Sequence, residues 1–293
     1  MDYGGLVRKA LDIMWKFKYL WIFGFFLEFG SGGGTWFGNL PDKVKLPVSH
    51  YIRGDILGGA LVGAILLLIA VALLIFLVFI IMYIISQGGM IHCVRKIQIG
   101  ENATLRDGWD AGVKYFWRIL GISFLMLIII FAAGILTLGP FIVGIVAFKA
   151  FGLLLGVVLF PLFLVILVTI LMIDLYATRA CVVEGKGVFD SIAAGWDMLK
   201  SNLGPSLIVG LISVGSTMAY TIGFVIVGLL LATPFIAIAA FNLLLGVFLG
   251  VMVGLIYIGI VSAMWGTYID SLWTLAYLEI KKPRPQPAAV PQA

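Results

Sequence analysis

The chain of 293 residues is predicted to be an all-α integral membrane protein with six transmembrane helices. Three observations predict this fold class: 62% of the residues are hydrophobic, only 11% are charged, and the mean hydropathy is +1.17. Soluble domains are about 45–50% apolar and about 25% charged, and a water-soluble fold of this size cannot bury so much apolar surface. The composition therefore excludes a soluble enzyme, a disordered chain and a disulfide-stabilised scaffold.

Six apolar runs supply the predicted spans, at residues 19–29, 56–86, 119–137, 152–176, 205–231 and 243–278. About 20 helical residues cross a hydrocarbon core of about 30 Å, so the second and sixth runs are expected to tilt or to project from the membrane. The short first run follows basic residues, which also fits a signal peptide. Because Glu28 lies inside this run and no A-x-A cleavage site follows it, we interpret it as the first transmembrane helix.

The apolar segment 139–151 lies between the third and fourth runs and has more than one interpretation. It fits a re-entrant or interfacial stretch, with the Lys149 side chain reaching toward the headgroups. A seventh short span is the alternative, but that span would reverse every later loop and would mix the basic residues between the two sides.

The basic residues sort to one side of a six-span arrangement, the side that carries both termini. Fifteen of the nineteen lie there: Arg8, Lys9, Lys16, Lys18, Arg95, Lys96, Arg106, Lys114, Arg118, Arg179, Lys186, Lys200, Lys281, Lys282 and Arg284. By the positive-inside rule, both termini are predicted to be cytoplasmic. The net charge of +5 therefore indicates membrane topology, and we expect no nucleic-acid partner.

A repeat with an offset of 83 residues lies in the segments on this basic side. Glu101, Asp107, Ala111-Gly112 and Leu120-Gly121 recur as Glu184, Asp190, Ala194-Gly195 and Leu203-Gly204. Each copy has apolar residues at helical spacing opposite charged ones, and a fainter copy runs from Leu6 to Leu20. Such helices lie along the membrane interface. We name them elbow helices and assign Trp109, Trp117 and Trp196 to them.

The chain is therefore predicted to be a single transmembrane domain at residues 1–282, followed by a disordered Pro-rich tail at 283–293. The domain divides into three repeats, at about 2–88, 89–178 and 179–280, each an elbow helix followed by a helical hairpin. The elbow helices either seat the spans in the headgroup layer or form a platform for anionic lipid or a partner.

Two segments, Trp15–Gly24 and Val182–Gly204, resemble a large group of uncharacterised prokaryotic membrane proteins. Some members are labelled as similar to the membrane domain of glycerophosphoryl diester phosphodiesterases. The resemblance covers nearly the whole chain and implies a six-helix module in the inner (cytoplasmic) membrane. It implies no reaction, because a separate soluble barrel carries catalysis in the named enzymes and these residues do not encode one.

The residues that usually carry chemistry are few. His92-Cys93 is the nearest approach to a metal motif, but zinc takes three or four ligands at paired spacing, and the sequence has neither C-x-x-C nor H-E-x-x-H. His50 and His92 fall on opposite predicted faces, so no Ser-His-Asp triad is indicated. We expect no enzymatic activity, no metal and no cofactor.

Acidic residues near the membrane are the better candidates, because burying a carboxylate is costly. Asp174 and Asp270 lie in the fourth and sixth runs, and Arg179 follows the first of them. One interpretation is an interfacial ion pair with Arg179, and the other is a proton or ion relay.

A stripe of small residues on the sixth run predicts close helix packing. Its glycines are Gly246, Gly250, Gly254 and Gly266, and Gly210, Ser213, Thr217 and Tyr220 form a matching face on the fifth run. A solvated cavity between these two helices is the alternative.

Together these features favour a scaffold or accessory subunit that holds lipid or a partner protein on a basic cytoplasmic rim of elbow helices. A homo-oligomer is compatible with the same surface. The alternative function is a small-molecule or lipid transporter with a cavity between the repeats, and an enzyme acting on lipid comes third.

Overall fold

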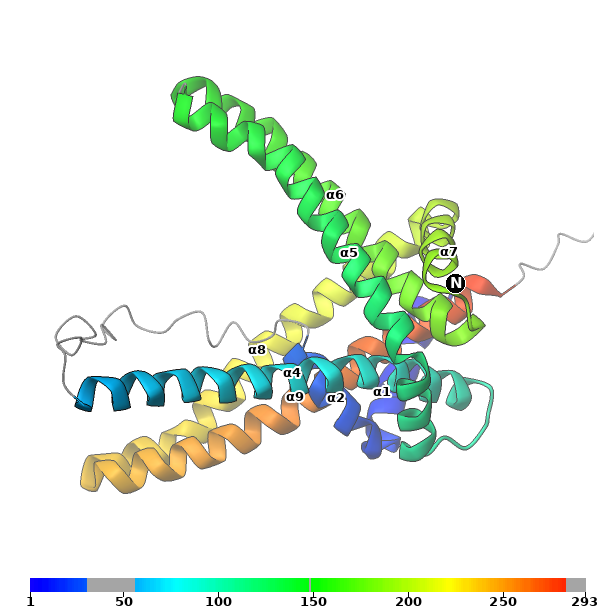
Figure 1. Ribbon diagram of the computed structural model, residues 1–293. Coiled ribbons are helices and arrows are strands. Elements are labelled where there is room, and N and C mark those ends of the chain that lie inside the picture. Colours follow the sequence, from blue (N-terminus) through cyan, green and yellow to red (C-terminus); the bar gives the residue numbers. More distant parts are fainter. Residues whose placement is uncertain (31–55, 148, 283–293) are drawn as a thin grey trace, which may run out of the picture.

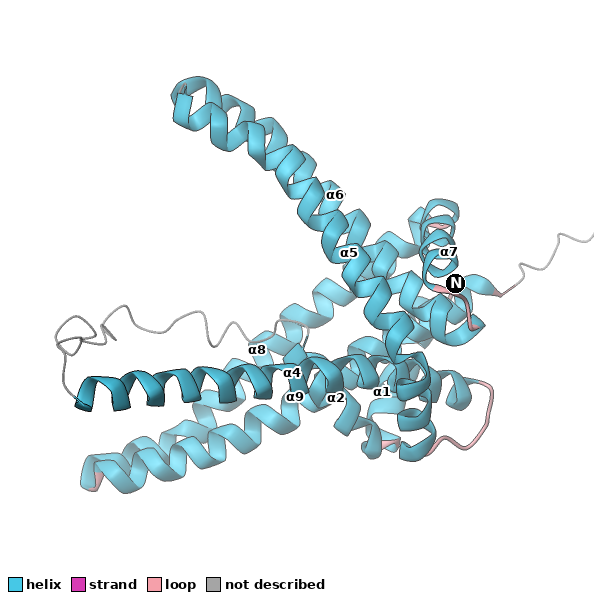
Figure 2. Cartoon of the chain, in the orientation of Figure 1, coloured by secondary structure: helices cyan, strands magenta, loops and turns pink. Residues whose placement is uncertain are grey.

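The computed structural model describes residues 1–30, 56–147 and 149–282, and this part of the chain is helical and has no strands (Figure 2). The helices are α1 (Tyr3–Lys16), the short 3₁₀ helix η1 (Lys18–Leu20), α2 (Trp21–Gly30), α4 (Ile56–Gln98), α5 (Leu105–Ala147), α6 (Lys149–Glu184), α7 (Val188–Ser201), α8 (Leu203–Phe241) and α9 (Leu243–Lys281). Residues 31–55 of the predicted outer loop and the predicted tail at 283–293 lie outside the described residues.

Five of the described helices, α4, α5, α6, α8 and α9, are long and apolar enough to cross a membrane. Each has between 36 and 43 residues, so each exceeds the length that a hydrocarbon core of about 30 Å requires. The predicted class of all-α, multi-pass membrane protein is confirmed at this level. The helix in the first predicted run, α2, has ten residues within the described part of the chain.

The molecule has a hub from which three apolar arms diverge (Figure 1). We define the arms as residues 63–81 of α4, the hairpin of 127–146 with 155–169 from α5 and α6, and the hairpin of 214–261 from α8 and α9. The hub comprises residues 1–30, 82–126, 170–213 and 262–282. The main buried cluster lies in the hub and joins α1, α2, α4, α6 and α9.

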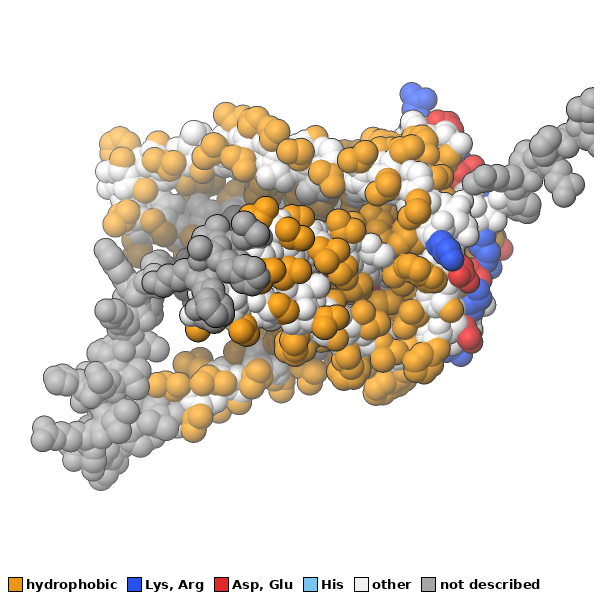
Figure 3. Space-filling view, turned by 90° about the horizontal axis from the view of Figure 1, so that it is seen from above, with side chains coloured by type: hydrophobic (Ala, Val, Ile, Leu, Met, Phe, Trp, Pro, Cys, Tyr) orange, Lys and Arg blue, Asp and Glu red, His pale blue; other side chains and the backbone are white. Residues whose placement is uncertain are grey.

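Charged side chains gather at the hub end of the molecule, whereas hydrophobic side chains cover the arms (Figure 3). The N-terminal helix α1 packs against the C-terminal helix α9 in the hub, so the described ends of the chain lie at this same end. In the α4 arm, every residue from 63 to 78 is exposed.

The elbow helices differ from one another. The first and third are separate helices, α1 and α7, of 14 residues each. The prediction of a separate middle elbow is wrong, because residues 105–121 are the first part of the continuous helix α5. The two copies differ at the position that follows the elbow. Asn202 leaves the helical conformation after α7 (φ −137°, ψ 42°), whereas its counterpart 83 residues earlier, Ile119, is fully buried within α5.

Segment 139–151 forms the tip of a helical hairpin. Helix α5 continues through Pro140 to Ala147, and α6 begins at Lys149, so only residue 148 lies between them and is itself outside the described residues. A proline normally interrupts a helix because it lacks the backbone N–H. The sequence alone therefore allowed more than one interpretation of residues 139–151.

Three glycines make the closest helix crossings in the hub. Gly112 of α5 lies against the carbonyl of Ile85 on α4, and Gly195 of α7 lies against the carbonyl of Ile173 on α6. Gly24 of α2 lies against the carbonyl of Ala263 on α9. A methyl group on any of the three would overlap the facing backbone, so only glycine permits these approaches.

Candidate functional site

An ion pair joins α6 to α9 in the centre of the hub. Arg179 Nη2 donates a hydrogen bond to Asp270 Oδ1 over 2.7 Å, and Arg179 Nη1 donates to the Leu175 carbonyl over 2.9 Å. The Arg179 side chain is fully buried and that of Asp270 is 11% exposed. We expected a partly hydrated pair, but protein encloses most of it. A buried charge pair costs desolvation that only good geometry offsets.

The second predicted carboxylate, Asp174, lies near this pair without joining it by a hydrogen bond. Its Oδ1 atom is buried and has no hydrogen-bond partner in the described protein. The hydroxyl of Tyr83 on α4 interacts electrostatically with Asp174, Asp270 and Arg179. The structure thus gathers the three predicted residues in one region and adds Tyr83, which the sequence reasoning missed.

Further polar atoms are buried around this region on the same three helices. Within the described residues, those without a hydrogen-bond partner include Ser86 Oγ, Gln87 Oε1, Thr178 Oγ1, Ser271 Oγ, Thr274 Oγ1 and Asp270 Oδ2. Each unpaired buried group costs about 1–3 kcal/mol, and native proteins commonly satisfy such groups with ordered water. Ser86 and Gln87 interrupt a long apolar run, a signal that points to a functional position in a membrane helix.

A second charged cluster ties the end of α6 to the end of α9. Glu184 accepts from Lys281 Nζ at 2.6 Å and from Lys186 Nζ at 2.9 Å, and it also accepts from the Tyr277 hydroxyl. Two arginines close the same end of α6 by donating to backbone carbonyl groups, one in its last turn and one just after its end. They are Arg95, bound to Val183 at 2.8 Å, and Arg118, bound to Gly185 at 2.8 Å.

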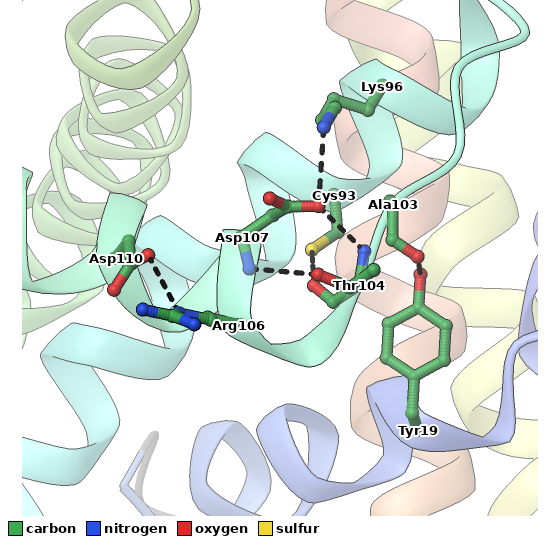
Figure 4. A network of polar contacts seen from close by, with 8 residues as sticks. All are labelled: Tyr19, Cys93, Lys96, Ala103, Thr104, Arg106, Asp107 and Asp110. Carbon is green, nitrogen blue, oxygen red and sulfur yellow. Dashed lines mark hydrogen bonds and ion pairs between the residues drawn. The ribbon is translucent and has the colours of Figure 1, made fainter.

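The connection between α4 and α5 is held by a reciprocal capping arrangement (Figure 4). The Thr104 backbone N–H donates to Asp107 Oδ2 at 2.9 Å, and the Asp107 N–H donates to Thr104 Oγ1 at 3.2 Å. Lys96 pairs with the same Asp107 oxygen at 3.2 Å, and the Tyr19 hydroxyl donates to the Ala103 carbonyl at 2.8 Å. The capping box fixes where α5 begins, and Tyr19 fastens η1 to this connection.

Cys93 of the His92-Cys93 pair, which was not expected to bind a metal, has a structural contact in this region. Cys93 Sγ donates a weak hydrogen bond to the Thr104 carbonyl at 3.7 Å, and both Cys93 and Cys181 are buried free thiols. Over the ranges 1–30, 56–147 and 149–282, the structure gathers no group of three or more His, Cys, Asp or Glu side chains able to hold a metal ion.

The predicted elbow tryptophans are exposed. Trp109 and Trp196 are 43% and 47% exposed, and Trp117 is 77% exposed. Tryptophan rings at a membrane–water boundary favour contact with the headgroup layer.

The glycines of the predicted stripe divide into close and open positions. Gly266 faces the Gly24 backbone of α2, and Gly246 faces the Ala239 backbone of α8. Gly250 faces the Phe235 side chain: a methyl group in place of its hydrogen would lie 3.2 Å from Phe235 Cβ. A methyl group on Gly254 would meet no described atom within 4 Å.

On the matching face of α8, each predicted residue has its own neighbour. Ser213 accepts from Trp273 Nε1 at 3.1 Å, and the Tyr220 ring stacks on Trp265 with centroids 4.3 Å apart. Thr217 bonds back to the Ser213 carbonyl of its own helix, and Gly210 faces Met172 of α6.

Comparison with known proteins adds no relative: no protein-family model, no curated protein sequence and no solved structure matches the chain.

Proposed function

We propose that this chain is a six-span membrane scaffold or accessory subunit without enzymatic activity, which holds anionic lipid on a basic cytoplasmic rim. The observation that carries this proposal is a set of cations without ion pairs on the elbow helices. Within the described residues, Arg8, Lys9, Lys18, Lys114 and Lys200 are exposed and form no ion pair. Each Lys or Arg near an anionic leaflet contributes about 1 kcal/mol of attraction.

The apolar side of the same helices supports a location at the membrane surface. Leu105, Val113 and Phe189 are exposed large hydrophobic side chains of the elbow segments, as are their tryptophans. In water such a face would be unfavourable, but in the headgroup layer it is buried against acyl chains while the lysines meet phosphates.

The three glycine crossings support the proposed threefold repeat. In each, a glycine lies on a carbonyl of a long helix, at Ile85, Ile173 and Ala263. The long helix precedes the glycine in the chain at the first two crossings, whereas α9 follows Gly24. The crossing between α2 and α9 links the start of the chain to its end, which is the contact that closes a ring of three units. The gathering of charge at the hub end supports cytoplasmic termini by the positive-inside rule.

Thiol labelling tests this topology. Cys93 and Cys181 are fully buried, so the wild-type chain serves as an unreactive background. An impermeant reagent added to intact cells should label a Ser49→Cys variant and not a Lys114→Cys variant, with both labelled after membrane disruption. Labelling of Lys114→Cys in intact cells would contradict the proposed orientation.

Lipid retention tests the rim. The purified full-length protein should retain anionic phospholipid enriched about twofold or more over the source membrane. The double variant Lys9→Gln with Lys114→Gln should lose part of that enrichment, and Lys9→Arg with Lys114→Arg should keep it. Equal lipid composition in all three preparations would exclude the basic rim as a lipid-holding surface.

The polar region around Arg179 favours a second candidate function, an ion or small-molecule transporter. Its buried, unpartnered oxygens on α4, α6 and α9 would suit a bound water chain or cation. In proteoliposomes, the double variant Asp174→Asn with Asp270→Asn distinguishes the two functions. A pH gradient that the wild type dissipates and the double variant preserves would favour the transporter, whereas equal flux favours the scaffold.

A further inference from the structure

A groove lies between α6, α7 and α8 on the hub side of the α5–α6 and α8–α9 arms. Its volume is about 280 Å³. Each of the three helices contributes three residues to its walls, and these include Val168 and Met172 of α6, Trp196 and Leu199 of α7, and Leu207 of α8. An apolar cavity of about 150 Å³ stays free of water and can hold a benzene ring. This groove therefore has room for a stretch of several methylene groups.

The polar groups of the walls are already satisfied. Thr169 Oγ1 donates to the Val165 carbonyl at 2.8 Å, and Ser206 Oγ accepts from the Tyr176 hydroxyl at 2.8 Å while donating to the Asn202 carbonyl at 2.7 Å. A water molecule in the groove would find few partners, since a buried water needs two to four of them. The interior is thus suited to hydrocarbon.

One end of the groove is electropositive. Lys200 belongs to its lining and is exposed. Asp197, which is also exposed, lies one turn earlier on α7, and within the described residues neither side chain forms an ion pair. The groove also reaches Leu203, the first residue of α8, and no side chain caps that helix. Pro205 has no N–H and the Ser206 N–H donates to the Asn202 carbonyl at 3.0 Å, so Leu203 and Gly204 are the residues of this helix start whose N–H groups carry the partial positive charge that favours a phosphate.

The other side of the groove opens onto apolar surface. Val168, Leu203 and Leu207 are each about half exposed, and they continue into the exposed apolar faces of α6 and α8. A chain can therefore enter from the hydrocarbon of the membrane without crossing a polar barrier. Trp196, at 47% exposure, lies where an indole ring would meet the headgroup level.

We propose that this groove binds one acyl chain of an anionic phospholipid, with the phosphate against Lys200 and the start of α8. The site rests on the proposed function, since it specifies one binding position on the lipid-holding rim. It differs from the rest of the rim because it holds the chain as well as the headgroup.

Fluorescence quenching by brominated lipid tests the groove. The full-length protein is reconstituted into phosphatidylcholine vesicles that contain an equal fraction of phosphatidylglycerol or phosphatidylcholine brominated on the acyl chain near the headgroup. The difference in emission between wild type and Trp196→Phe isolates the signal of Trp196. We expect brominated phosphatidylglycerol to quench this signal at least about twofold more than brominated phosphatidylcholine.

Two variants and one control sharpen the result. Lys200→Gln should abolish the preference for phosphatidylglycerol, and Lys282→Gln, which removes an exposed lysine that pairs with Glu279 outside the groove and the rim, should keep it. Val168→Phe should fill the groove and reduce quenching by both lipids. Each variant is compared only after it elutes as a monodisperse protein.

The possible outcomes separate this site from the rim. If neither lipid quenches the Trp196 signal, the acyl-chain site is overturned. It is also overturned if quenching rises only with protein concentration, because that result would indicate a second copy of the chain in the groove. Equal quenching by both lipids, unchanged by Lys200→Gln, would overturn the anionic headgroup. If anionic lipid still co-purifies in these cases, the rim stands and only the groove fails.

Discussion

The two halves of α9 reverse the pattern expected of a soluble protein. From Leu243 to Ile260 the helix carries almost only apolar residues and glycine, and its large side chains are exposed along an arm. From Ser262 to Tyr277 it carries hydroxyl groups and Asp270, and most of these residues are buried in the hub. The polar groups of α9 are therefore buried in the hub beside apolar ones, whereas the apolar groups of the arm are exposed.

This contrast identifies the surroundings of the arms. In water, exposed leucine and valine surface of this extent would drive collapse. In hydrocarbon no such driving force exists between helices, and they associate through close packing and polar contacts. The hub has both, in its glycine crossings and its ion pairs, and the arms have few of either.

The largest expected effect in the hub follows removal of its central charge. Arg179→Met should leave Asp270 enclosed without its partner, and breaking a buried pair from one side costs about 3–5 kcal/mol. Thermal unfolding in detergent should show a large loss of stability or no folded protein.

A second substitution separates lost charge balance from lost packing. Combining Arg179→Met with Asp270→Leu removes both charges, and such replacements often restore stability. A double variant as unstable as Arg179→Met would show that the shape of the pair, and not its charge, holds α6 to α9.

Matched leucines on α9 test the comparison of hub and arm directly. Leu272 is 1% exposed and Leu255 is 61% exposed. Leu272→Ala should cost about 3 kcal/mol because it opens a cavity, and Leu255→Ala should leave the melting temperature in detergent nearly unchanged. Equal losses would mean that the arms are packed in the folded protein, against a second copy or against each other.

The sequence predicted the fold class and the helical runs because both depend on local composition and length. It also predicted that Asp174 or Asp270 would pair with Arg179, because a charged side chain inside a membrane is energetically costly unless an opposite charge lies beside it. Helix ends were less predictable. The helices extend well beyond the predicted apolar runs: α5 begins at Leu105 and not near residue 119. Here the amphipathic segment and the apolar segment form one continuous helix, because no residue between them ends it.

Tertiary contacts explain what the sequence could not supply. Tyr83 of α4 interacts with the charged groups of α6 and α9 only because three helices distant in the chain come together. The groove between α6, α7 and α8 depends on the turn at Asn202. The repeat predicted an end of the elbow helix near Leu203-Gly204, but it did not predict how α7 and α8 pack against α6. The glycine stripe was predicted as one face, yet α9 curves past two different partners, α2 at Gly266 and α8 at Gly246.

The smallest expected effect concerns this stripe, and its sign differs between hub and arm. In Gly266→Ala, the new methyl group overlaps the Gly24 carbonyl, and neither backbone can move without shifting a helix, so a loss of about 1–3 kcal/mol is expected. In Gly254→Ala, no described atom lies within 4 Å of the new methyl, and alanine favours a helix over glycine by about 0.5–1 kcal/mol. Melting curves of the two variants should therefore move in opposite directions from wild type. A loss of stability in Gly254→Ala would indicate that a second copy packs against the arm at this glycine, and the oligomeric state in detergent would then be expected to change with the substitution.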